Sequence, residues 1–236
     1  MPAAVVCLPT YNERENLEKM VRALAHLSVG VLVIDDNSPD GTGEIADRLA
    51  RELSWVEVLH RQHKDGLGRA YVDGFRHVLA GDAEFVLEMD CDFSHDPADV
   101  PRLIAAVEEG ADLALGSRYV PGGSTANWGL MRRLISRGAS IYTRVLLMPI
   151  RDATGGFKCF RRRVLESIDL ETIDAAGYVF QIETTYRTLR KGFRVVEVPI
   201  RFVDRTAGQS KMSRAIVLEA IWKVPRLRLQ ALTRRL

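Results

Sequence analysis

Asp90 and Asp92 are the two residues of this sequence best placed to hold a metal ion. They come directly after the apolar run Phe85–Met89, which is expected to form a strand. Residues i and i+2 of an extended chain point to the same face. Both carboxylates can therefore reach one hard cation. Ions such as Mg²⁺ take a few carboxylates and complete their shell with phosphate oxygens, so the pair favours a diphosphate as the ligand that shares the ion.

A second acidic pair, Asp35-Asp36, follows another apolar run, Val29–Ile34. Adjacent carboxylates repel each other unless a cation or a hydrogen-bond donor lies beside them. The next residues, 37–41, read Asn-Ser-Pro-Asp-Gly, which is good turn sequence in any fold. For this segment alone, a ligand-binding loop and a turn with no binding role are both open interpretations.

The motifs of several common nucleotide-binding and hydrolytic enzymes are absent from the sequence. It has no GxGxxG after a first strand, no GxxxxGK[ST], no GxSxG and no HExxH. These absences disfavour the usual dinucleotide site, a P-loop, a serine-hydrolase nucleophile and a zinc protease. Gly66-Leu67-Gly68 has two open interpretations, a loop that lets a ligand approach closely or the start of a helix.

Short apolar runs alternate with amphipathic stretches over the first hundred residues, and this alternation predicts the elements that position the acids. Strands are expected at 3–8, 29–34, 56–60 and 85–89, and helices at 16–27, 41–53 and 68–79. The alternation indicates an α/β fold with a mainly parallel central sheet, right-handed crossovers and flanking helices. Ligands of such sheets bind beyond the carboxyl ends of the strands, where both acidic pairs lie.

The segment from Leu113 to Arg151 contains no acidic residue and six arginines. Within it, apolar residues recur at helical spacing over 131–145, which predicts an amphipathic helix flanked by arginines. Two interpretations are open. The helix either packs its apolar stripe on the core or lies on an anionic bilayer.

The C-terminal region is predicted to contain a last strand, a polar loop and a basic helix. The strand is expected over 193–202 and the loop over 204–211. The helix that follows carries apolar residues on one stripe, and Pro225 is expected to kink or end it. These features divide the chain into a main domain, 1–210, and an amphipathic basic tail, 211–236.

Composition limits the class of protein. The 236 residues suffice for one domain, and 47% hydrophobic with 27% charged residues is typical of a globular fold. A formal net charge of +2 does not argue for a nucleic-acid partner. Three widely spaced cysteines without a CxxC pair speak against disulfides and zinc and fit a reducing cytosol. No secretory signal is expected, and no run reaches the roughly 18 apolar residues that a membrane span needs.

Several segments carry a resemblance to a known family. Those that resemble the family 2 glycosyltransferases of the GT-A fold are Val5–Glu13, Val33–Thr42, Gly66–Gly68 and Met89–His95. Those that are similar to dolichol- or polyprenol-phosphate mannose synthases are Gly116–Val120, Gly155–Lys158, Phe180-Gln181-x-Glu183 and Arg205-x-x-Gly208-x-Ser210-Lys211-Met212. The resemblance runs in order across nearly the whole chain. It implies a single GT-A catalytic domain over residues 1–210.

The resemblance implies transfer of mannose from GDP-mannose to a polyprenyl (dolichol-type) monophosphate, with inversion of the anomeric centre. It assigns Mg²⁺ or Mn²⁺ to Asp90 and Asp92 and places the backbone of Cys91 beside the nucleotide. The residues implied to contact the guanosine part are Pro9, Tyr11, Glu13, Ile34 and Asp36. Those implied to contact phosphates are Arg118, Arg205 and Lys211. The family usually has alanine at the position of Cys91, which is similarly small, so metal binding is still expected.

The expected chemistry needs cations more than it needs a base. A polyprenyl phosphate is already anionic at neutral pH, so no general base is assigned. Its approach to a sugar diphosphate must overcome repulsion, and arginine suits bidentate contact with phosphate. The candidates are Arg118, Arg133 and Arg205, and Arg132 could serve in place of Arg133. Catalytic roles are expected for Asp92, Arg118 and Arg205.

The acceptor's polyprenyl chain stays in the bilayer, so the protein is expected to act peripherally at the cytoplasmic face of a membrane. Each basic residue near anionic lipid contributes about 1 kcal/mol to such binding. A separate membrane-anchoring protein is an alternative means of attachment. Two rival functions are also open: transfer of glucose from UDP-glucose to the same acceptor, and a non-catalytic module that binds a nucleotide sugar.

Overall fold

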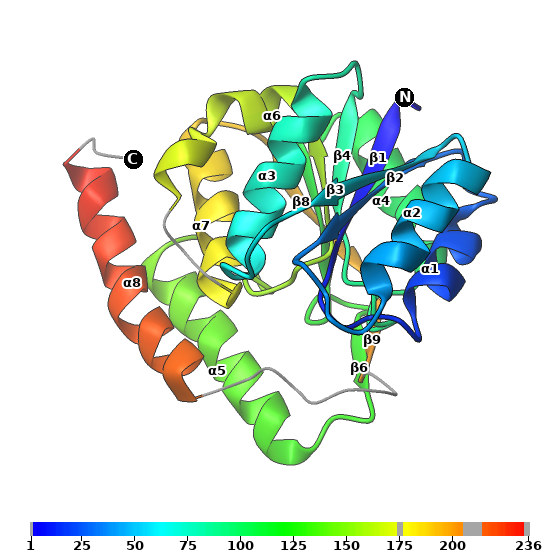
Figure 1. The fold of residues 1–236 in the computed structure, drawn as a ribbon. Helices are drawn as coiled ribbons and strands as arrows, with labels where there is room; N and C mark the ends of the chain where they lie inside the picture. Colours follow the sequence, from blue (N-terminus) through cyan, green and yellow to red (C-terminus); the bar gives the residue numbers. More distant parts are fainter. Residues whose placement is uncertain (1, 174–176, 205–213, 234–236) are drawn as a thin grey trace.

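A seven-stranded β-sheet forms the centre of the protein, seen here in a computed structural model (Figure 1). The structure describes residues 2–173, 177–204 and 214–233. The sheet order is β3-β2-β1-β4-β7-β5-β8, and neighbouring strands are parallel except where β7 pairs with β4 and β5. The strands are β1 (Ala4–Thr10), β2 (Gly30–Asp35), β3 (Val56–His60), β4 (Phe85–Glu88), β5 (Leu113–Ser117), β7 (Lys158–Arg161) and β8 (Val195–Pro199).

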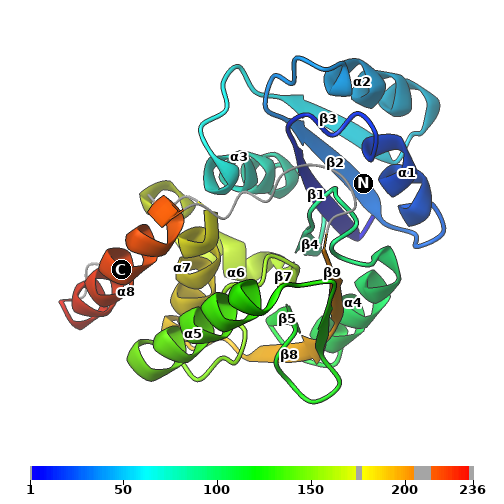
Figure 2. The ribbon, with the colours of Figure 1, turned by 90° about the horizontal axis from the view of Figure 1, so that it is seen from below.

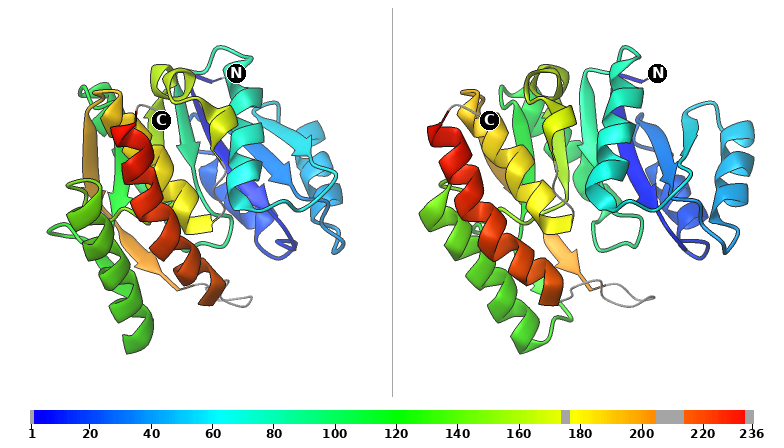
Figure 3. Two further views of the ribbon diagram at one scale, coloured as in Figure 1. Left: turned by 90° about the vertical axis from the view of Figure 1, so that its left-hand side faces the viewer. Right: turned by 60° about the vertical axis from the view of Figure 1, so that its left-hand side comes forward.

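Helices cover both faces of this sheet (Figures 1 and 3). One face is covered by α1 (Leu17–Leu24), α2 (Thr42–Glu52) and α4 (Val100–Glu108). The other is covered by α3 (Leu67–Leu79), α6 (Arg162–Ser167) and α7 (Gly177–Arg190). Two short 3₁₀ helices span Pro97–Asp99 and Leu170–Thr172. The predicted α/β fold with a mainly parallel sheet and flanking helices is confirmed.

Hydrophobic spacing explains why these segments form these elements. All residues of β2 are buried, as expected for a parallel strand that helices cover on both faces. In α1 the buried residues are Leu17, Met20, Val21 and Leu24, which recur at helical spacing. The sheet therefore sits between two hydrophobic layers, and its polar strand ends are left to form a site.

The segment 193–202, predicted as one strand, forms two strands that belong to different sheets. β8 ends at Pro199, and β9 (Arg201–Val203) pairs in parallel with β6 (Ser124–Ala126). The N–H of Ile200 still donates to the carbonyl of Ser117 at the end of β5, at 3.1 Å, while the carbonyl of Ile200 accepts from Ser124 N at 3.0 Å. The chain therefore passes at Ile200 from the main sheet to the two-stranded one. The prediction of a single strand was wrong, because hydrophobic spacing within one segment does not report that its partner strand changes along its length.

Pro225 lies inside α8 (Arg214–Leu232), which continues past it instead of ending there. A proline at this position leaves the carbonyl of Ile221, four residues earlier, without its helical N–H partner. The hydroxyl of Tyr142 donates a hydrogen bond to that carbonyl at 3.0 Å. Tyr142 belongs to α5 (Leu130–Leu146), so a neighbouring helix supplies the hydrogen bond that α8 cannot make for itself.

α5 turns polar side chains inward and apolar side chains outward. Ser136, Ser140 and Thr143 are buried, and the hydroxyl of Tyr119 donates to Ser136 Oγ at 2.7 Å. The apolar residues of α5 that are more than half exposed are Leu130, Met131, Leu134, Ile141 and Val145. The interpretation of the 131–145 stripe as a core-packing face is therefore wrong.

α5 and α8 lie side by side at the periphery of the molecule, and α8 also packs along α7 (Figures 1, 2 and 3). The side chains of α8 that are buried in these contacts include Val224, Leu227 and Ala231. In Figure 1, α5 extends beyond the edge of the sheet at which the parallel strands end. Among the described helices, none combines the length and apolar character that crossing a membrane requires.

Candidate active site

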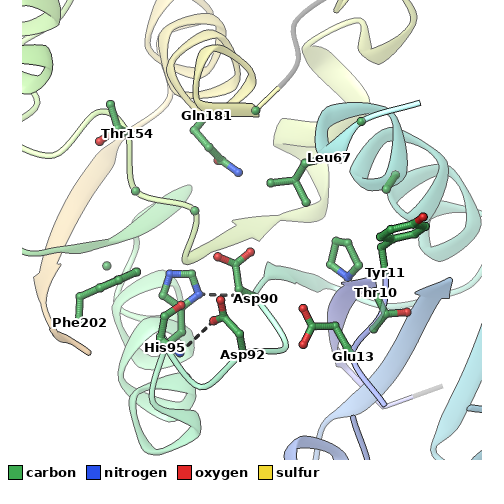
Figure 4. A pocket seen from close by; sticks show the side chains of 18 of the residues that line it. Thr10, Tyr11, Glu13, Leu67, Asp90, Asp92, His95, Thr154, Gln181 and Phe202 are labelled. Atoms are coloured by element: carbon green, nitrogen blue, oxygen red, sulfur yellow. Dashed lines mark hydrogen bonds between the residues drawn. The ribbon is translucent and has the colours of Figure 1, made fainter. Parts of the chain in front are cut away.

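A pocket opens at the carboxyl ends of β1, β2 and β4 (Figure 4). Its lining comes from segments that are far apart in the sequence: residues 9–13, Asp36, the loop 90–95, the loop 154–156 and the first turns of α7 and α5. Segments from the N-terminal and from the C-terminal half of the chain therefore line one cavity. The polar strand ends meet here as the parallel topology requires.

Tyr11, Lys64 and Asp36 form one end of the pocket, called here the nucleoside end. Nζ of Lys64 lies 3.5 Å from the centroid of the Tyr11 ring, a cation–π contact. Pro9 and Glu13 line the pocket as well. An aromatic ring and two carboxylates offer a stacking surface and hydrogen-bond acceptors, which suit the base and ribose of a nucleoside.

Arg61 supplies the cation that the Asp35-Asp36 pair requires. Its guanidinium forms ion pairs with Asp36 and, at 2.8 Å, with Asp73. Burial raises the pKa of Asp36, and Arg61 opposes that rise. Asp35 instead accepts hydrogen bonds from Ser38 Oγ at 2.6 Å and Ser38 N at 3.1 Å, so it stabilises the turn. The sequence analysis missed Arg61, although its place directly after β3, at the same sheet edge, was a signal.

Asp90 and Asp92 lie in the pocket on the loop that follows β4 (Figure 4). Asp92 Oδ1 accepts a hydrogen bond from Ser94 N at 3.0 Å, and the Asp90 N–H donates to His95 Nδ1 at 3.1 Å. The Ser94 hydroxyl lines the same pocket, is buried, and meets no hydrogen-bond partner among the described residues. A single loop thus carries two carboxylates and a hydroxyl whose oxygens could be ligands of a metal ion.

This donor set fits a divalent ion that shares its coordination shell with a ligand. Within the described part of the chain, no group of three or more His, Cys, Asp and Glu side chains could hold a metal ion. Mg²⁺ does not need such a group, because it binds through one or two carboxylates together with substrate phosphates. Asp90 and Asp92 can provide that pair. Ser94 Oγ is a further oxygen that the sequence analysis missed.

His95, as a neutral imidazole, holds the acidic loop in position. It is buried, stacks on Phe157 with ring centroids 4.9 Å apart, and meets Phe202 edge-on. Burial lowers the pKa of His95 to about 4, so the ring is uncharged at neutral pH and Nδ1 can accept the hydrogen bond from Asp90. Two aromatic neighbours therefore hold the backbone of Asp90 in position through one imidazole.

Ile34 and Cys91, expected near the nucleotide, have buried side chains that do not line the pocket. Ile34 packs closely on α3, since a Cβ added at Gly74 would lie 2.3 Å from Ile34 Cδ1. Cys91 joins the hydrophobic layer beneath α1 and α4. Any contact that these two residues make with a ligand must come from the backbone, as the resemblance implied for Cys91.

Arg118 lines the pocket with a guanidinium that Asp152 holds in place. Arg118 Nε lies 2.7 Å from Asp152 Oδ2 and Nη2 lies 2.5 Å from Oδ1, while Nη2 also donates to Thr154 Oγ1 at 2.9 Å. Asp152 is fully buried, so the pair sets the orientation of the guanidinium and offsets part of its charge. A phosphate that meets Arg118 would meet a group already oriented.

Arg132 reaches the pocket from α5, whereas Arg133 does not. Arg132 Nη1 donates to Asp204 Oδ1 at 2.5 Å, and both residues line the pocket. Arg133 is exposed and outside the lining, so the structure favours the neighbour that the sequence had left as an alternative. Arg205 and Lys211 lie outside the described residues, and their phosphate contacts stay predictions.

Gly155, Gly156 and Gln181 form a further wall of the pocket. A Cβ at Gly155 would lie 3.0 Å from the carbonyl oxygen of Gly116, so close packing against the end of β5 requires glycine there. Gln181 comes from α7 and points into the pocket on the side of Asp90 (Figure 4). The sequence analysis quoted Gln181 for the resemblance alone and gave it no role.

Known proteins are similar to this chain in sequence and in fold. Residues 5–169 match the family described as Glycosyl transferase family 2. Polyprenol monophosphomannose synthase from Mycolicibacterium smegmatis is 50% identical over 224 residues, which cover 93% of this chain and 84% of that protein. Undecaprenyl-phosphate mannosyltransferase from Micrococcus luteus is 49% identical over 227 residues, 95% of this chain and 93% of that protein. Mannosyl-3-phosphoglycerate synthase from Rubrobacter xylanophilus has a like fold, with a TM-score of 0.70 at 16% identity over 100% of this chain and 76% of its own.

Proposed function

The chain belongs to glycosyl transferase family 2, and we propose that it transfers mannose from GDP-mannose to a polyprenyl monophosphate. The observation that carries this proposal is the position of the pocket beside the exposed apolar face of α5. Arg132 lines the pocket, while Met131 and Leu134 on the same helix are more than half exposed. A water-soluble sugar nucleotide and a phosphate on an apolar chain can therefore meet at one place.

The relatives support the choice of both substrates. The two proteins at 50% and 49% identity are named for mannose and for polyprenol or undecaprenyl phosphate. Because the matches extend over 93% and 95% of this chain, we assign it the same transferred sugar and the same class of acceptor. GDP-mannose as the donor follows from the resemblance of the later segments to polyprenol-phosphate mannose synthases.

In the proposed reaction, an oxygen of the acceptor phosphate bonds to the anomeric carbon of mannose as the bond from that carbon to the diphosphate breaks. GDP leaves, and the anomeric configuration inverts. The acceptor phosphate is ionised at neutral pH, so the reaction needs no strong general base. The main task of the protein is to bring two anions together in a fixed geometry.

Asp90 and Asp92 are the residues that would hold Mg²⁺ or Mn²⁺ against the donor diphosphate. When bound, such an ion offsets the negative charge that develops on the departing diphosphate. The N–H of Ser94 orients the Asp92 carboxylate, and His95 positions the backbone of Asp90. This loop is therefore arranged for the donor before the donor binds.

Arg118 and Arg132 supply positive charge on the acceptor side of the pocket, the part that they line together with Phe202. Asp152 orients Arg118, and Asp204 orients Arg132. A phosphate that enters from the α5 side passes these guanidinium groups before it reaches the donor. Arg205 and Lys211 belong to the same proposed set on the strength of the resemblance.

α5 is proposed to rest on the cytoplasmic face of a membrane. Its outward apolar side chains can enter the headgroup region, and Arg133 and Arg137 beside them are exposed. Each of these charges adds about 1 kcal/mol of attraction to anionic lipid. Peripheral attachment would bring the pocket to the depth at which a polyprenyl phosphate presents its headgroup.

Transfer of radiolabel from GDP-mannose into an organic-extractable product tests the reaction. The assay contains purified protein, a short polyprenyl phosphate and Mg²⁺, and UDP-glucose is run in parallel. Label from GDP-mannose that disappears with EDTA is the expected result. Label from UDP-glucose alone would replace the proposed donor, and label from neither would contradict the proposed reaction.

Asp92→Asn is the variant that tests the metal-binding role. It keeps the side-chain volume but weakens cation binding, so cation-dependent GDP binding and transfer should both be lost. Asp96→Asn is the matched control, because Asp96 is exposed in the same region and its side chain accepts a hydrogen bond from Ala98 N, which asparagine can also accept. Cation-dependent GDP binding and transfer that are equal in the two variants would contradict the metal-binding role of Asp92. GDP binding by the wild type without any transfer would favour a non-catalytic binding module.

Flotation with anionic liposomes tests membrane attachment. The wild-type chain should float at low salt, and Arg133→Gln/Arg137→Gln should float less because two attractive charges are removed. Arg51→Gln/Arg102→Gln, exposed arginines on α2 and α4, is the matched control. Absence of wild-type flotation even at low salt would contradict autonomous attachment and favour a separate anchoring protein.

A further inference from the structure

The three residues Phe180, Gln181 and Glu183 of one short motif have three different environments. The Phe180 ring stacks on Tyr71 with centroids 5.9 Å apart, inside the hydrophobic layer beneath α3. Glu183 pairs with Arg187 at 2.5 Å on the same helix. Of the three side chains, that of Gln181 alone lines the pocket.

The Gln181 amide is a buried polar group in need of a partner. The residue is 2% exposed, and neither Nε2 nor Oε1 makes a hydrogen bond of good geometry with the described residues. The buried Glu88 carboxyl lies close enough to interact with the amide, and this interaction opposes the rise that burial causes in the pKa of Glu88. A Cβ at Gly156 would lie 3.4 Å from Nε2, so the glycine leaves space next to the amide. Buried amides are nearly always hydrogen-bonded, and Glu88 can engage only part of a group that has two donor hydrogens and one acceptor oxygen. The hydrogen-bonding capacity that is left points to a ligand as the further partner.

The position of Gln181 is fixed by its own backbone. Lys158 Nζ donates to the carbonyl of Gln181 at 2.8 Å and to Thr184 Oγ1 at 2.9 Å. The hydroxyl of Thr185 donates to the same carbonyl at 3.0 Å. These bonds tie the first turns of α7 to β7, so the amide is presented to the pocket from a rigid element.

The arrangement of the pocket indicates which part of the donor Gln181 faces. The nucleoside end carries Tyr11, the carboxylates of Asp90 and Asp92 suit the diphosphate, and the acceptor must arrive from the α5 side. The sugar therefore lies beyond the diphosphate and towards α5. Gln181 projects from α7 into the pocket on the side of Asp90 (Figure 4). Its amide therefore faces the space in which the sugar is expected.

We propose that the side-chain amide of Gln181 hydrogen-bonds a hydroxyl group of the transferred hexose and so contributes to selection of the donor sugar. The proposal rests on the proposed function, because it takes a hexose diphosphonucleoside as the ligand. An amide offers one acceptor and two donors, and a sugar hydroxyl can both accept and donate. A sugar that lacks the hydroxyl, or presents it in the other configuration, leaves the buried amide unpaired.

Deoxy analogues of GDP-mannose, each lacking one hydroxyl of the hexose, test the proposal with Gln181→Met. This variant keeps the length of the side chain and removes both polar atoms. With GDP-mannose, kcat/KM should fall about 10-fold or more. With the one analogue that lacks the bound hydroxyl, wild type and Gln181→Met should have nearly the same kcat/KM, because the interaction is absent from both.

Thr188→Val is the matched control. Thr188 lies about two turns further along α7, is buried, donates to the carbonyl of Thr184 at 2.7 Å and does not line the pocket. It should show the wild-type ranking of the analogues. Should Gln181→Met fail to fold, Gly156→Ala gives a second test, because its added methyl group fills the space beside the amide and should weaken the same analogue-specific preference.

The outcomes separate this proposal from the function on which it rests. Wild-type protein that transfers no mannose contradicts the proposed function itself. Wild-type protein that transfers mannose, with Gln181→Met lowering kcat/KM by the same factor for GDP-mannose and for every analogue, contradicts the role of Gln181. Binding of GDP alone should be equal in wild type and Gln181→Met, because GDP has no hexose.

Discussion

Single residues act in this protein mainly through the pairing of buried charge. Arg61 balances Asp36 beside Tyr11 and Lys64, and Asp152 balances Arg118 in the part of the pocket proposed for the acceptor. Removal of one partner from a buried pair leaves the other charge without compensation, which costs far more than loss of a surface pair. The pocket is therefore sensitive to residues that need not touch a ligand.

Arg61→Leu should lower the free energy of unfolding by about 3 kcal/mol and weaken GDP binding. The side chains of Arg61 and Asp36 are 8% and 9% exposed, so the carboxylate left behind has little access to water. Urea denaturation and calorimetric titration with GDP measure the two effects. Arg48→Leu is the control, since its pair with Glu18 is exposed and should contribute less than about 1 kcal/mol. Equal losses for both variants would contradict the role of burial.

Lys158 should make stability depend on pH in the alkaline range. Burial lowers the pKa of Lys158 to about 8 from the ordinary 10.5. Between these values the unfolded chain keeps the proton and the folded chain does not, so stability relative to Lys158→Met rises with pH. The shift predicts that the wild type gains about 2 kcal/mol over the variant between pH 8 and pH 10.

Urea denaturation of wild type and Lys158→Met at pH 8 and pH 10 measures this difference. Glu88 works in the same direction, because burial raises its pKa to about 7 and loss of Lys158 removes the cation that opposes the rise. Lys191→Met, a change of an exposed lysine, is the control and should show no such pH dependence. A difference that shrinks as pH rises would contradict the prediction.

At the scale of elements, the contact between α5 and α8 combines apolar packing with hydrogen bonds from side chains to backbone carbonyls, one of them from Arg228 to the carbonyl of Leu146. Pro225 frees the carbonyl of Ile221, and Tyr142 from α5 donates to it. The proline that disrupts the helical ladder of α8 thereby creates a docking point for α5. This explains how a helix with an internal proline stays continuous.

Tyr142→Phe should destabilise the protein by about 1 kcal/mol, because the carbonyl of Ile221 loses its donor. In a Pro225→Ala background the same change should cost less, since the alanine N–H can take over the carbonyl. Urea denaturation of the two single variants and the double variant measures the coupling. Additive effects would show that the Tyr142 hydroxyl does not compensate for the proline.

At the scale of the whole molecule, the pocket joins both halves of the sheet. β1, β2 and β4 contribute the nucleoside end and the acidic loop, and α5 and α7 contribute the opposite walls. A ligand that touches all these segments binds the folded chain and not the unfolded one. Its binding free energy therefore adds to global stability.

GDP with Mg²⁺ at about 100 times Kd should add about 2.7 kcal/mol to the stability of the folded state. For a chain of this length, that corresponds to a rise in Tm of roughly 5–10 °C. Differential scanning fluorimetry with and without EDTA measures it. The same rise in the presence of EDTA would contradict a shared divalent ion, and Asp92→Asn should remove the cation-dependent part.

Much of the fold and part of the site were predictable from the sequence. Apolar spacing reported which side chains share a face, so the strands and helices of the first hundred residues were found within a few residues of their ends. Polar residues directly after apolar runs marked the carboxyl edge of the sheet, and Asp90 and Asp92 lie in the pocket there. These features are local, and local spacing determines them.

Other features depended on contacts between residues far apart in the chain. Arg61 lies 25 positions from Asp36, and no spacing rule joins them. Arg132 and Arg133 are equivalent in sequence, yet the docking of α5 turns the first into the pocket and the second into solvent. Helical periodicity predicts that the apolar residues of α5 share one face. It does not predict whether that face is buried, and in the folded protein α5 buries its hydroxyl-bearing face and exposes the apolar one. Tertiary structure decides such questions because burial is a property of the whole assembled molecule, whereas periodicity is a property of one segment.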